Sequence, residues 1–260
     1  MERYERLKLT VAYDGRPFRG WQSQPNGNGI QDHLKNAFFT ILAQPVKLHG
    51  AGRTDAGVHA FAQVAHVDVL YHKYALPTWT AALNAHLPRE IRVLKCEHAR
   101  DGFHAQYSAV GKVYIYRIWN HPIHHPLEIA RSWHVVQPLD LDALRSARNR
   151  LIGTHDFASF AANRGRVEET TRTIYDIRIK RRRELLTVEF AANGFLYRMA
   201  RMLIGSMTKV ASGRKPLSWF DQLLHEPGKQ KADLTAPPEG LYLLKVLYSK
   251  IQEPGTGDTR

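Results

Sequence analysis

The sequence has few features of a secreted or membrane-spanning protein. Only one of its 260 residues is a cysteine, Cys96, so no disulfide can form within the chain. It has no run of eighteen apolar residues, so we expect no transmembrane helix. Its first residues, Met1 to Arg6, lack the apolar segment of a signal peptide. Together these absences predict a protein of the reducing cytoplasm, away from the membrane.

Motifs for metals and nucleotides are also missing. The fourteen histidines include a cluster at His121, His124 and His125, but no cysteine pair accompanies it and no His-Glu-x-x-His occurs. We interpret that cluster as a loop surface and expect no metal site. The glycine-rich run at residues 50–59 is not a Walker loop, because no Lys-Ser/Thr pair follows its glycines.

Negative charge is in short supply. The chain has 37 Lys and Arg residues against 24 Asp and Glu, which gives a net charge of +13. Such a field favours a polyanionic partner, and nucleic acid is the commonest one for a soluble protein. An acidic membrane surface is the competing interpretation. With 43% hydrophobic and 10% aromatic residues, the chain can bury a substantial core.

Hydrophobic periodicity predicts two related α/β halves whose sheets could join. We place the boundary near residue 105, which gives an N-terminal half at 1–105 and a C-terminal half at 106–260. In the first half we expect strands at 7–13, 46–49, 61–70 and 91–98, and helices at 30–42 and 77–87. In the second half we expect strands at 110–119, 174–179, 186–190 and 241–248, and helices at 140–151, 195–211 and 217–224. Asp140 is the expected helix cap, and Cys96 is expected to be a packed core thiol.

One acid stands within the glycine-rich run Gly50 to His59. Three glycines and two alanines allow a close backbone approach there, and Asp55 lies two residues after Arg53 and two before Gly57. A phosphate cradle would rarely place a carboxylate at its centre, since like charges repel. The arrangement suits an Asp held ionised by nearby cations. The alternative is a structural turn with an Asx hydrogen bond. The residues alone support the two interpretations equally.

The run Gly52-Arg53-Thr54-Asp55-Ala56-Gly57-Val58-His59-Ala60 resembles the catalytic-Asp signature of the tRNA pseudouridine synthase A family. Five further stretches resemble that family in order along nearly the whole chain. They are Tyr13 to Gln22, Asp101 to Ala105 followed by Lys112 to Tyr116, Asp156 to Phe160, Asn193 to Arg201, and Gly240 to Leu243.

The resemblance implies a fold and a reaction. The fold would be the α/β (α+β) pseudouridine synthase fold: two ferredoxin- or RRM-like halves, with mostly antiparallel sheets joined around a central cleft and helices outside. The reaction would be the isomerisation of uridine to pseudouridine at positions 38, 39 and 40 of the tRNA anticodon stem-loop. It implies no cofactor and no metal, with tRNA as partner and a homodimer as the working form.

The resemblance also implies site residues. Asp55 would be the nucleophile or base, with two orders open: attack on the sugar first, or removal of a proton first. Arg201 would be its ion-pair partner, on a helix where Gly205 lets another backbone or RNA approach. Tyr114 would stack on the target base. It shares one face of a strand with Tyr116 and Ile118, and the alternative is that both tyrosines pack the core of the sheet.

The other wall of the base pocket would be Leu243, which as an apolar strand residue may equally be plain core. Arg53 would contact the RNA backbone or hold the flipped base open. Further RNA contacts are expected from Lys112 and Arg198, and from Arg181, Arg182 and Arg183 at a hairpin tip. Arg164 and Arg166, which flank Gly165 in a loop, are candidates for the same kind of phosphate contact.

Two alternatives compete with an RNA isomerase. A non-catalytic RNA-binding module of ferredoxin-like halves would also be basic and carry strand aromatics. A nucleotide-binding enzyme that used Gly50-Ala51-Gly52 would need Lys or Thr contacts that the sequence lacks. Asp55 argues against a mere binder, since a carboxylate facing phosphates would weaken binding.

Overall fold

A single sheet of ten strands organises the protein. The computed structural model describes residues 3–25, 27–71, 73–162 and 169–249. The strands follow the order β4-β1-β3-β10-β5-β9-β8-β7, with β2 paired to β3 and β6 paired to β5. All pairs are antiparallel except β3–β10 and β5–β6, so the sheet is mixed but mostly antiparallel, as expected.

The first hundred residues follow the predicted order closely. The first strand ends at the turn signal Asp14-Gly15, and the first helix carries its buried residues at helical spacing. The elements are β1 (Tyr4–Tyr13), α1 (Ile30–Leu42), β2 (Leu48–Gly50), β3 (His59–Leu70), α2 (Leu76–His86) and β4 (Ile91–His98). Cys96 is a buried residue of β4, and burial raises the pKa of its thiol to about 12, which confirms a core thiol.

The later part of the chain adds more strands than the sequence predicts. The short strands β6 and β7 were not expected, because three or four residues carry too little periodicity to detect. The elements are β5 (Gly111–Asn120), β6 (Trp133–Val135), α3 (Leu141–Leu151), β7 (Gly153–Asp156), β8 (Thr171–Arg182), β9 (Leu185–Ala192), α4 (Met199–Ala211), α5 (Leu217–His225) and β10 (Leu241–Leu247). Asp140 caps α3 as expected, since its side chain accepts from the backbone N–H groups of Asp142 and Ala143.

Three expected details of the later part are corrected by the structure. The helix expected at 195–211 begins only at Met199, because Arg198 has a left-handed φ of 60° that a helix does not tolerate. Arg198 therefore lies before the helix rather than on its face. The hairpin strands are longer than expected, so its tip is only Arg183 and Glu184, with Arg181 and Arg182 in the strand. Arg164 and Arg166 lie outside the described residues.

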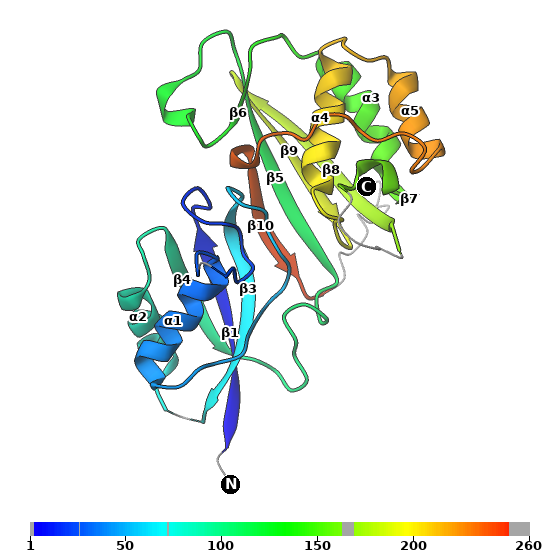
Figure 1. Cartoon of the computed structure of the whole chain (residues 1–260). Helices are drawn as coiled ribbons and strands as arrows, with labels where there is room; N and C mark the ends of the chain where they lie inside the picture. Colours follow the sequence, from blue (N-terminus) through cyan, green and yellow to red (C-terminus); the bar gives the residue numbers. More distant parts are fainter. Residues whose placement is uncertain (1–2, 26, 72, 163–168, 250–260) are drawn as a thin grey trace, which may run out of the picture.

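The same strand order occurs twice in the sheet. Around β1 it is β4-β1-β3 with β2 beyond, and around β5 it is β10-β5-β9 with β8 beyond. The two sets meet where β10 pairs in parallel with β3, through Tyr242 opposite His59 and Leu243 opposite Ala60. The expectation that the two sheets join is therefore confirmed. Figure 1 shows β10 between the N-terminal strands and the later ones.

One row of residues crosses six neighbouring strands, from β1 to β8, through this junction. Residues directly opposite each other in neighbouring strands point to the same face. The row runs through Tyr13, Ala60, Leu243, Tyr114, Phe190 and Ile177, and all six belong to the main hydrophobic core. Helices α1 and α2 lie beside the N-terminal strands and α3, α4 and α5 beside the later ones (Figure 1). None of the helices in the described part of the chain is long and apolar enough to cross a membrane.

Candidate active site at Asp55

The loop that carries Asp55 joins β2 to β3 at the junction of the sheet. Its first residue is fixed by the N–H of Ala51, which donates to the carbonyl of Val64 at 2.8 Å. Its last turn closes where the N–H of Val58 donates to the carbonyl of Asp55 at 3.1 Å. The side chain of Asp55 is 20% exposed, so the carboxylate is half-buried but still open to a ligand.

A second segment, Tyr13 to Trp21, supports this loop from behind. The N–H of Trp21 donates to the carbonyl of Thr54 at 3.1 Å, and the hydroxyls of Tyr13 and Thr54 share a hydrogen bond of 2.8 Å. Gly20 has a φ of +88°, and a Cβ there would lie 2.5 Å from the Thr54 carbonyl oxygen. The sequence marked this segment only by its resemblance, and the contacts with Thr54 give it a physical role.

The expected ion pair between Asp55 and Arg201 is present. Arg201 lies in the first turn of α4, and its Nη1 donates to Oδ2 of Asp55 at 2.9 Å. Both side chains are largely shielded, with 11% of the Arg201 side chain exposed. A charge-assisted hydrogen bond in such surroundings is stronger than one at the open surface.

Arg201 is itself held by a segment that the sequence analysis missed. Its Nε donates to the carbonyl of Ala236 at 2.7 Å, and the N–H of Ala236 donates back to the carbonyl of Arg201 at 3.1 Å. Gly205 packs directly against the backbone of Leu234, so the expected close approach at this glycine is confirmed for a backbone. The run Ala236-Pro237-Pro238 signals only an extended chain, which says nothing about its partner.

Tyr114 lies near Asp55, and the surroundings of its hydroxyl differ from those of Tyr13 and Tyr116. Its ring is only 7% exposed and meets Phe195 edge-on, with 5.0 Å between the ring centroids. Burial first, and then the charges of Tyr13 and Asp55, raise the pKa of its hydroxyl above the usual range, so the hydroxyl stays protonated at neutral pH. That hydroxyl makes no hydrogen bond to any residue that the structure describes, whereas a buried Tyr hydroxyl usually finds a partner.

Tyr116 and Leu243 belong to the core. Tyr116 is fully buried and its hydroxyl donates to the carbonyl of Pro237 at 2.8 Å. Leu243 is also fully buried, in the row between Ala60 and Tyr114. The expected shared face of Tyr114 and Tyr116 is confirmed by their alternating burial along β5. Leu243 is therefore adjacent to Tyr114, but its side chain is not exposed to solvent.

The expected RNA-binding cations fall into two groups. Arg53 is exposed on the Asp55 loop, and Lys112 is half-buried beside Gly52 of the same loop. Arg198 is half-buried just before α4, with its guanidinium 5.1 Å from the ring centre of Tyr197. Three exposed arginines are not near this site: Arg181, Arg182 and Arg183 lie where β9 begins opposite Trp119, about 17 Å along β5 from Tyr114.

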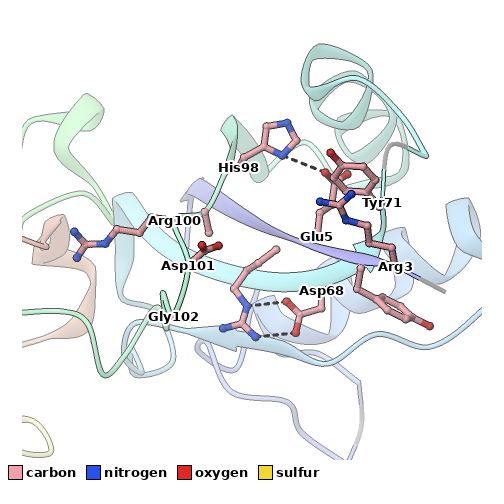
Figure 2. Close-up of a pocket in the computed structure, with 11 residues that line it drawn as sticks. Arg3, Glu5, Asp68, Tyr71, His98, Arg100, Asp101 and Gly102 are labelled. Carbon is pink, nitrogen blue, oxygen red and sulfur yellow. Dashed lines mark hydrogen bonds and ion pairs between the residues drawn. The ribbon is translucent and has the colours of Figure 1, made fainter. Parts of the chain in front are cut away.

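A hollow at the opposite end of β1 and β3 is not part of this site. Figure 2 shows the contact between His98 and Glu5 and the hydrogen bonds that Asp68 accepts. Arg6 donates two hydrogen bonds to Asp68, at 2.7 and 2.8 Å, and His98 lies 3.2 Å from Glu5. Within the described residues no group of three or more His, Cys, Asp or Glu side chains is placed to hold a metal ion.

Comparison with known proteins gives a consistent result. The sequence pattern of a family described as tRNA pseudouridine synthase matches residues 9–108 and 147–249. The tRNA pseudouridine synthase A of Akkermansia muciniphila is 41% identical to this chain over 251 residues, 94% of this chain and 95% of that protein. The tRNA pseudouridine synthase A of Nitrobacter hamburgensis is 40% identical over 244 residues, 94% of this chain and 99% of that protein.

Solved structures resemble the chain more distantly. A chain in the structure of an H/ACA RNP bound to a substrate RNA containing 2'-deoxyuridine aligns with 90% of this chain and 59% of its own length. The TM-score is 0.37 and the sequence identity 13%. At that TM-score the likeness adds nothing to the comparison of sequences.

Proposed function

We propose residue roles for this site from one established premise: the chain belongs to the tRNA pseudouridine synthase A family. Its activity is the isomerisation of uridine to pseudouridine in the anticodon stem-loop of tRNA. We assign that activity to Asp55 with Arg201 and Tyr114, and we take uridines 38, 39 and 40 as the targets. The observation that carries this assignment is the shielded ion pair between Asp55 and Arg201.

The reaction redistributes bonds within one nucleotide. The bond between N1 of uracil and C1′ of the ribose breaks, the uracil turns, and C5 forms a new bond to C1′. The hydrogen on C5 leaves as a proton, and N1 gains one. Reactant and product contain the same atoms in the same oxidation state, so no redox partner and no group donor is required.

Asp55 can serve this chemistry only as a carboxylate. An ionised oxygen is needed both for attack on the sugar and for removal of a proton, so both orders of events use the same group. Arg201 compensates the charge from 2.9 Å away, and Ala236 fixes the guanidinium through Nε. The carboxylate of Asp55 remains accessible to a ligand, because 20% of its side chain is exposed.

Tyr114 is the proposed platform for the uracil. The target base must leave the stack of the RNA, and an aromatic ring compensates part of the lost stacking, about 1–3 kcal/mol per base. Its protonated, unpaired hydroxyl can donate to a uracil oxygen or relay the C5 proton. It cannot serve as a free base at neutral pH, because its pKa is raised. Leu243, next to Tyr114 in the row, would form the neighbouring wall.

Cations on the same side of the sheet would bind the RNA. Arg53 is exposed two residues from Asp55 and is proposed to hold the flipped nucleotide, with Lys112 and Arg198 nearby. The three arginines of the β8–β9 hairpin would contact the tRNA farther from the target. The net charge of +13 supports attraction of the whole polyanion.

Both halves of the chain would contribute to one site. We propose residues 1–105 as the half that supplies Asp55 and residues 106–260 as the half that supplies Tyr114 and Arg201. We further propose a homodimer, supported by exposed apolar side chains between β5 and β6: Ile123, Leu127 and Ile129 are 72%, 76% and 56% exposed. Light scattering of wild type and of Leu127→Asp tests this point. As tRNA in bacteria is modified in the cytoplasm, that is the proposed compartment.

Mapping pseudouridines in cellular tRNA tests the proposed function. In a strain that lacks this protein, tRNA should lose pseudouridine at positions 38, 39 and 40 and keep it elsewhere. Supplying the wild-type protein should restore those positions, and supplying Asp55→Asn should not. Loss of pseudouridine at other positions, with these three unchanged, would overturn the target assignment.

A further inference from the structure

Lys112 is a half-buried cation with no counter-ion among the residues that the structure describes. Its ammonium group makes no hydrogen bond and no ion pair with any residue in the described part of the chain. Burial and the neighbouring charge of Arg172 both lower its pKa. Removing a cation from water without an anion costs free energy, so proteins rarely keep one without a functional reason.

The position of Lys112 links it to the reaction site. It lies two residues before Tyr114 on β5, so the two side chains share a face about 7 Å apart along the strand. On its other side it touches the Asp55 loop, since a Cβ on Gly52 would lie 2.8 Å from Cε of Lys112 and 3.3 Å from Nζ. The missing side chain at residue 52 is what leaves room for the ammonium group.

Arg172 adds a second positive charge on the same face. Lys112 lies opposite Ala192, which lies opposite Ile174, and Arg172 is two residues before Ile174 on β8. The guanidinium donates to two neutral carbonyls, those of Glu169 at 3.1 Å and Thr171 at 2.6 Å. The carboxylate of Glu169, the acid nearest to Arg172 in sequence, accepts from the N–H of Thr171. Glu169 is near enough for its charge to act on Arg172, but no carboxylate in the described residues forms an ion pair with either cation.

We propose that Lys112 and Arg172 form the binding site for a phosphodiester of the tRNA next to the target uridine. This inference rests on the proposed function, since it takes Tyr114 as the platform for the flipped base. A phosphate group supplies the anion that Lys112 lacks among the described residues, and a charged acceptor for the guanidinium of Arg172. It lies within reach because the phosphates on either side of a nucleotide are close to its base. The pair would anchor the backbone while the base enters between Tyr114 and Asp55.

The salt dependence of tRNA binding distinguishes this role from a structural one. Binding is measured in the Asp55→Asn background, which removes turnover. Lys112→Gln should raise Kd about tenfold and reduce the slope of log K against log salt by about one, the change expected for one lost phosphate contact. Lys245→Gln is the matched control, because Lys245 is exposed on β10 opposite Val113, on the other face of the sheet. An unchanged slope for Lys112→Gln would overturn the proposal.

A neutral phosphate in the RNA identifies the contact directly. A methylphosphonate is placed at the phosphate before or after the target uridine. At one of these two positions it should weaken binding about tenfold to protein that retains Lys112. With Lys112→Gln or with Arg172→Gln, the same substitution should cause no further loss. Additive losses at both positions would contradict the proposal. Wild-type protein that binds this way but forms no pseudouridine at positions 38–40 would instead contradict the proposed function alone.

The stability of the free protein gives an independent check on Lys112. If Lys112 is an unpaired cation kept for RNA, then Lys112→Gln should melt at or above the wild-type temperature. A structural lysine would give the opposite result, a lower melting temperature together with weaker binding. That result would overturn the proposal for Lys112.

Discussion

Arg201 and Asp55 lie 146 residues apart in the sequence, yet Nη1 of Arg201 donates to Oδ2 of Asp55 at 2.9 Å. The contact joins α4 to the loop before β3, and so it links the later part of the chain to the N-terminal strands near the junction of β3 and β10. Arg201 makes its second hydrogen bond to the carbonyl of Ala236, so its guanidinium is fixed from two sides. The geometry of the acid therefore depends on an arginine rather than on a positive charge in general.

Replacing Arg201 by lysine should show this dependence. Arg201→Lys keeps the charge but loses the planar fork that reaches Asp55 and Ala236 together, so the single-turnover rate should fall about 100-fold. Arg201→Ala should also lower the free energy of unfolding, by about 2–4 kcal/mol, because it leaves a shielded carboxylate unpaired. Arg150→Ala is the control, since its pair with Asp221 is exposed and worth below about 1 kcal/mol. A lysine variant with the wild-type rate would contradict this account.

Tyr114 and Tyr116 should respond differently to the loss of a hydroxyl. Tyr114→Phe keeps the ring, so tRNA affinity should stay within about threefold while the rate falls at least about tenfold. Tyr114→Leu should lose affinity as well, by about 1–3 kcal/mol. Tyr116→Phe should leave the rate unchanged and cost about 1 kcal/mol of stability, because its hydroxyl only bonds Pro237. Equal rates for Tyr114→Phe and wild type would remove the hydroxyl from the chemistry.

Gly20 should be a sensitive position, because it packs against the backbone of the Asp55 loop. Gly20→Ala forces a side chain into a left-handed residue and against the Thr54 carbonyl, so it should displace the Asp55 loop and cost about 1–3 kcal/mol of stability. Gly27→Ala is the matched control, because Gly27 also has a positive φ but has open space around it. If both variants lost the same stability and activity, the contact with Thr54 would be unimportant.

Protonation of His66 should weaken the fold in mild acid. Burial, followed by the charges of Arg6, His104 and His49, lowers the pKa of His66 to about 4. Its Nδ1 accepts from the N–H of Ala105, which requires the neutral ring. Because the folded-state pKa lies below the unfolded value of about 6.5, the unfolded state binds more protons in between. The free energy of unfolding should have its full value above pH 6.5 and should fall by about 2–3 kcal/mol as the pH approaches 4.

The variant His66→Asn tests the source of that pH dependence. Its side-chain oxygen can still accept from Ala105 but does not titrate, so the curve of stability against pH should become flatter. His86→Asn, at an exposed histidine, should leave the curve as it is in wild type. A pH dependence that persists in His66→Asn would assign it to other groups.

The sequence predicted the parts of this site that have local or family signatures. The order of strands and helices follows from periodicity, and the pairing of Asp55 with Arg201, which the resemblance implied, is present in the structure. The helix expected at 195–211 wrongly included Arg198, because a left-handed residue before a helix leaves no mark in hydrophobic spacing. Periodicity also could not separate the roles of Tyr114 and Tyr116, which share a face and differ only in what their hydroxyls meet.

Long-range supports were invisible in the sequence. The hydrogen bonds of Ala236 with Arg201, and of Trp21 with Thr54, are made by backbone atoms that every residue carries. Backbone groups have no residue type to mark their partner, so only the fold shows where they meet. The same holds for Lys112 beside Gly52, whose packing depends on the approach of a loop sixty residues earlier in the chain.

The most direct test of the account is tritium release by Asp55→Asn. Wild-type protein should release tritium from tRNA that carries C5-labelled uridine at positions 38, 39 and 40, because the C5 hydrogen leaves during isomerisation. Asp55→Asn should bind the same tRNA with nearly the wild-type Kd and release none, while Asp101→Asn, at an exposed acid, should match wild type. Tritium release by Asp55→Asn at near the wild-type rate would contradict the central role of Asp55.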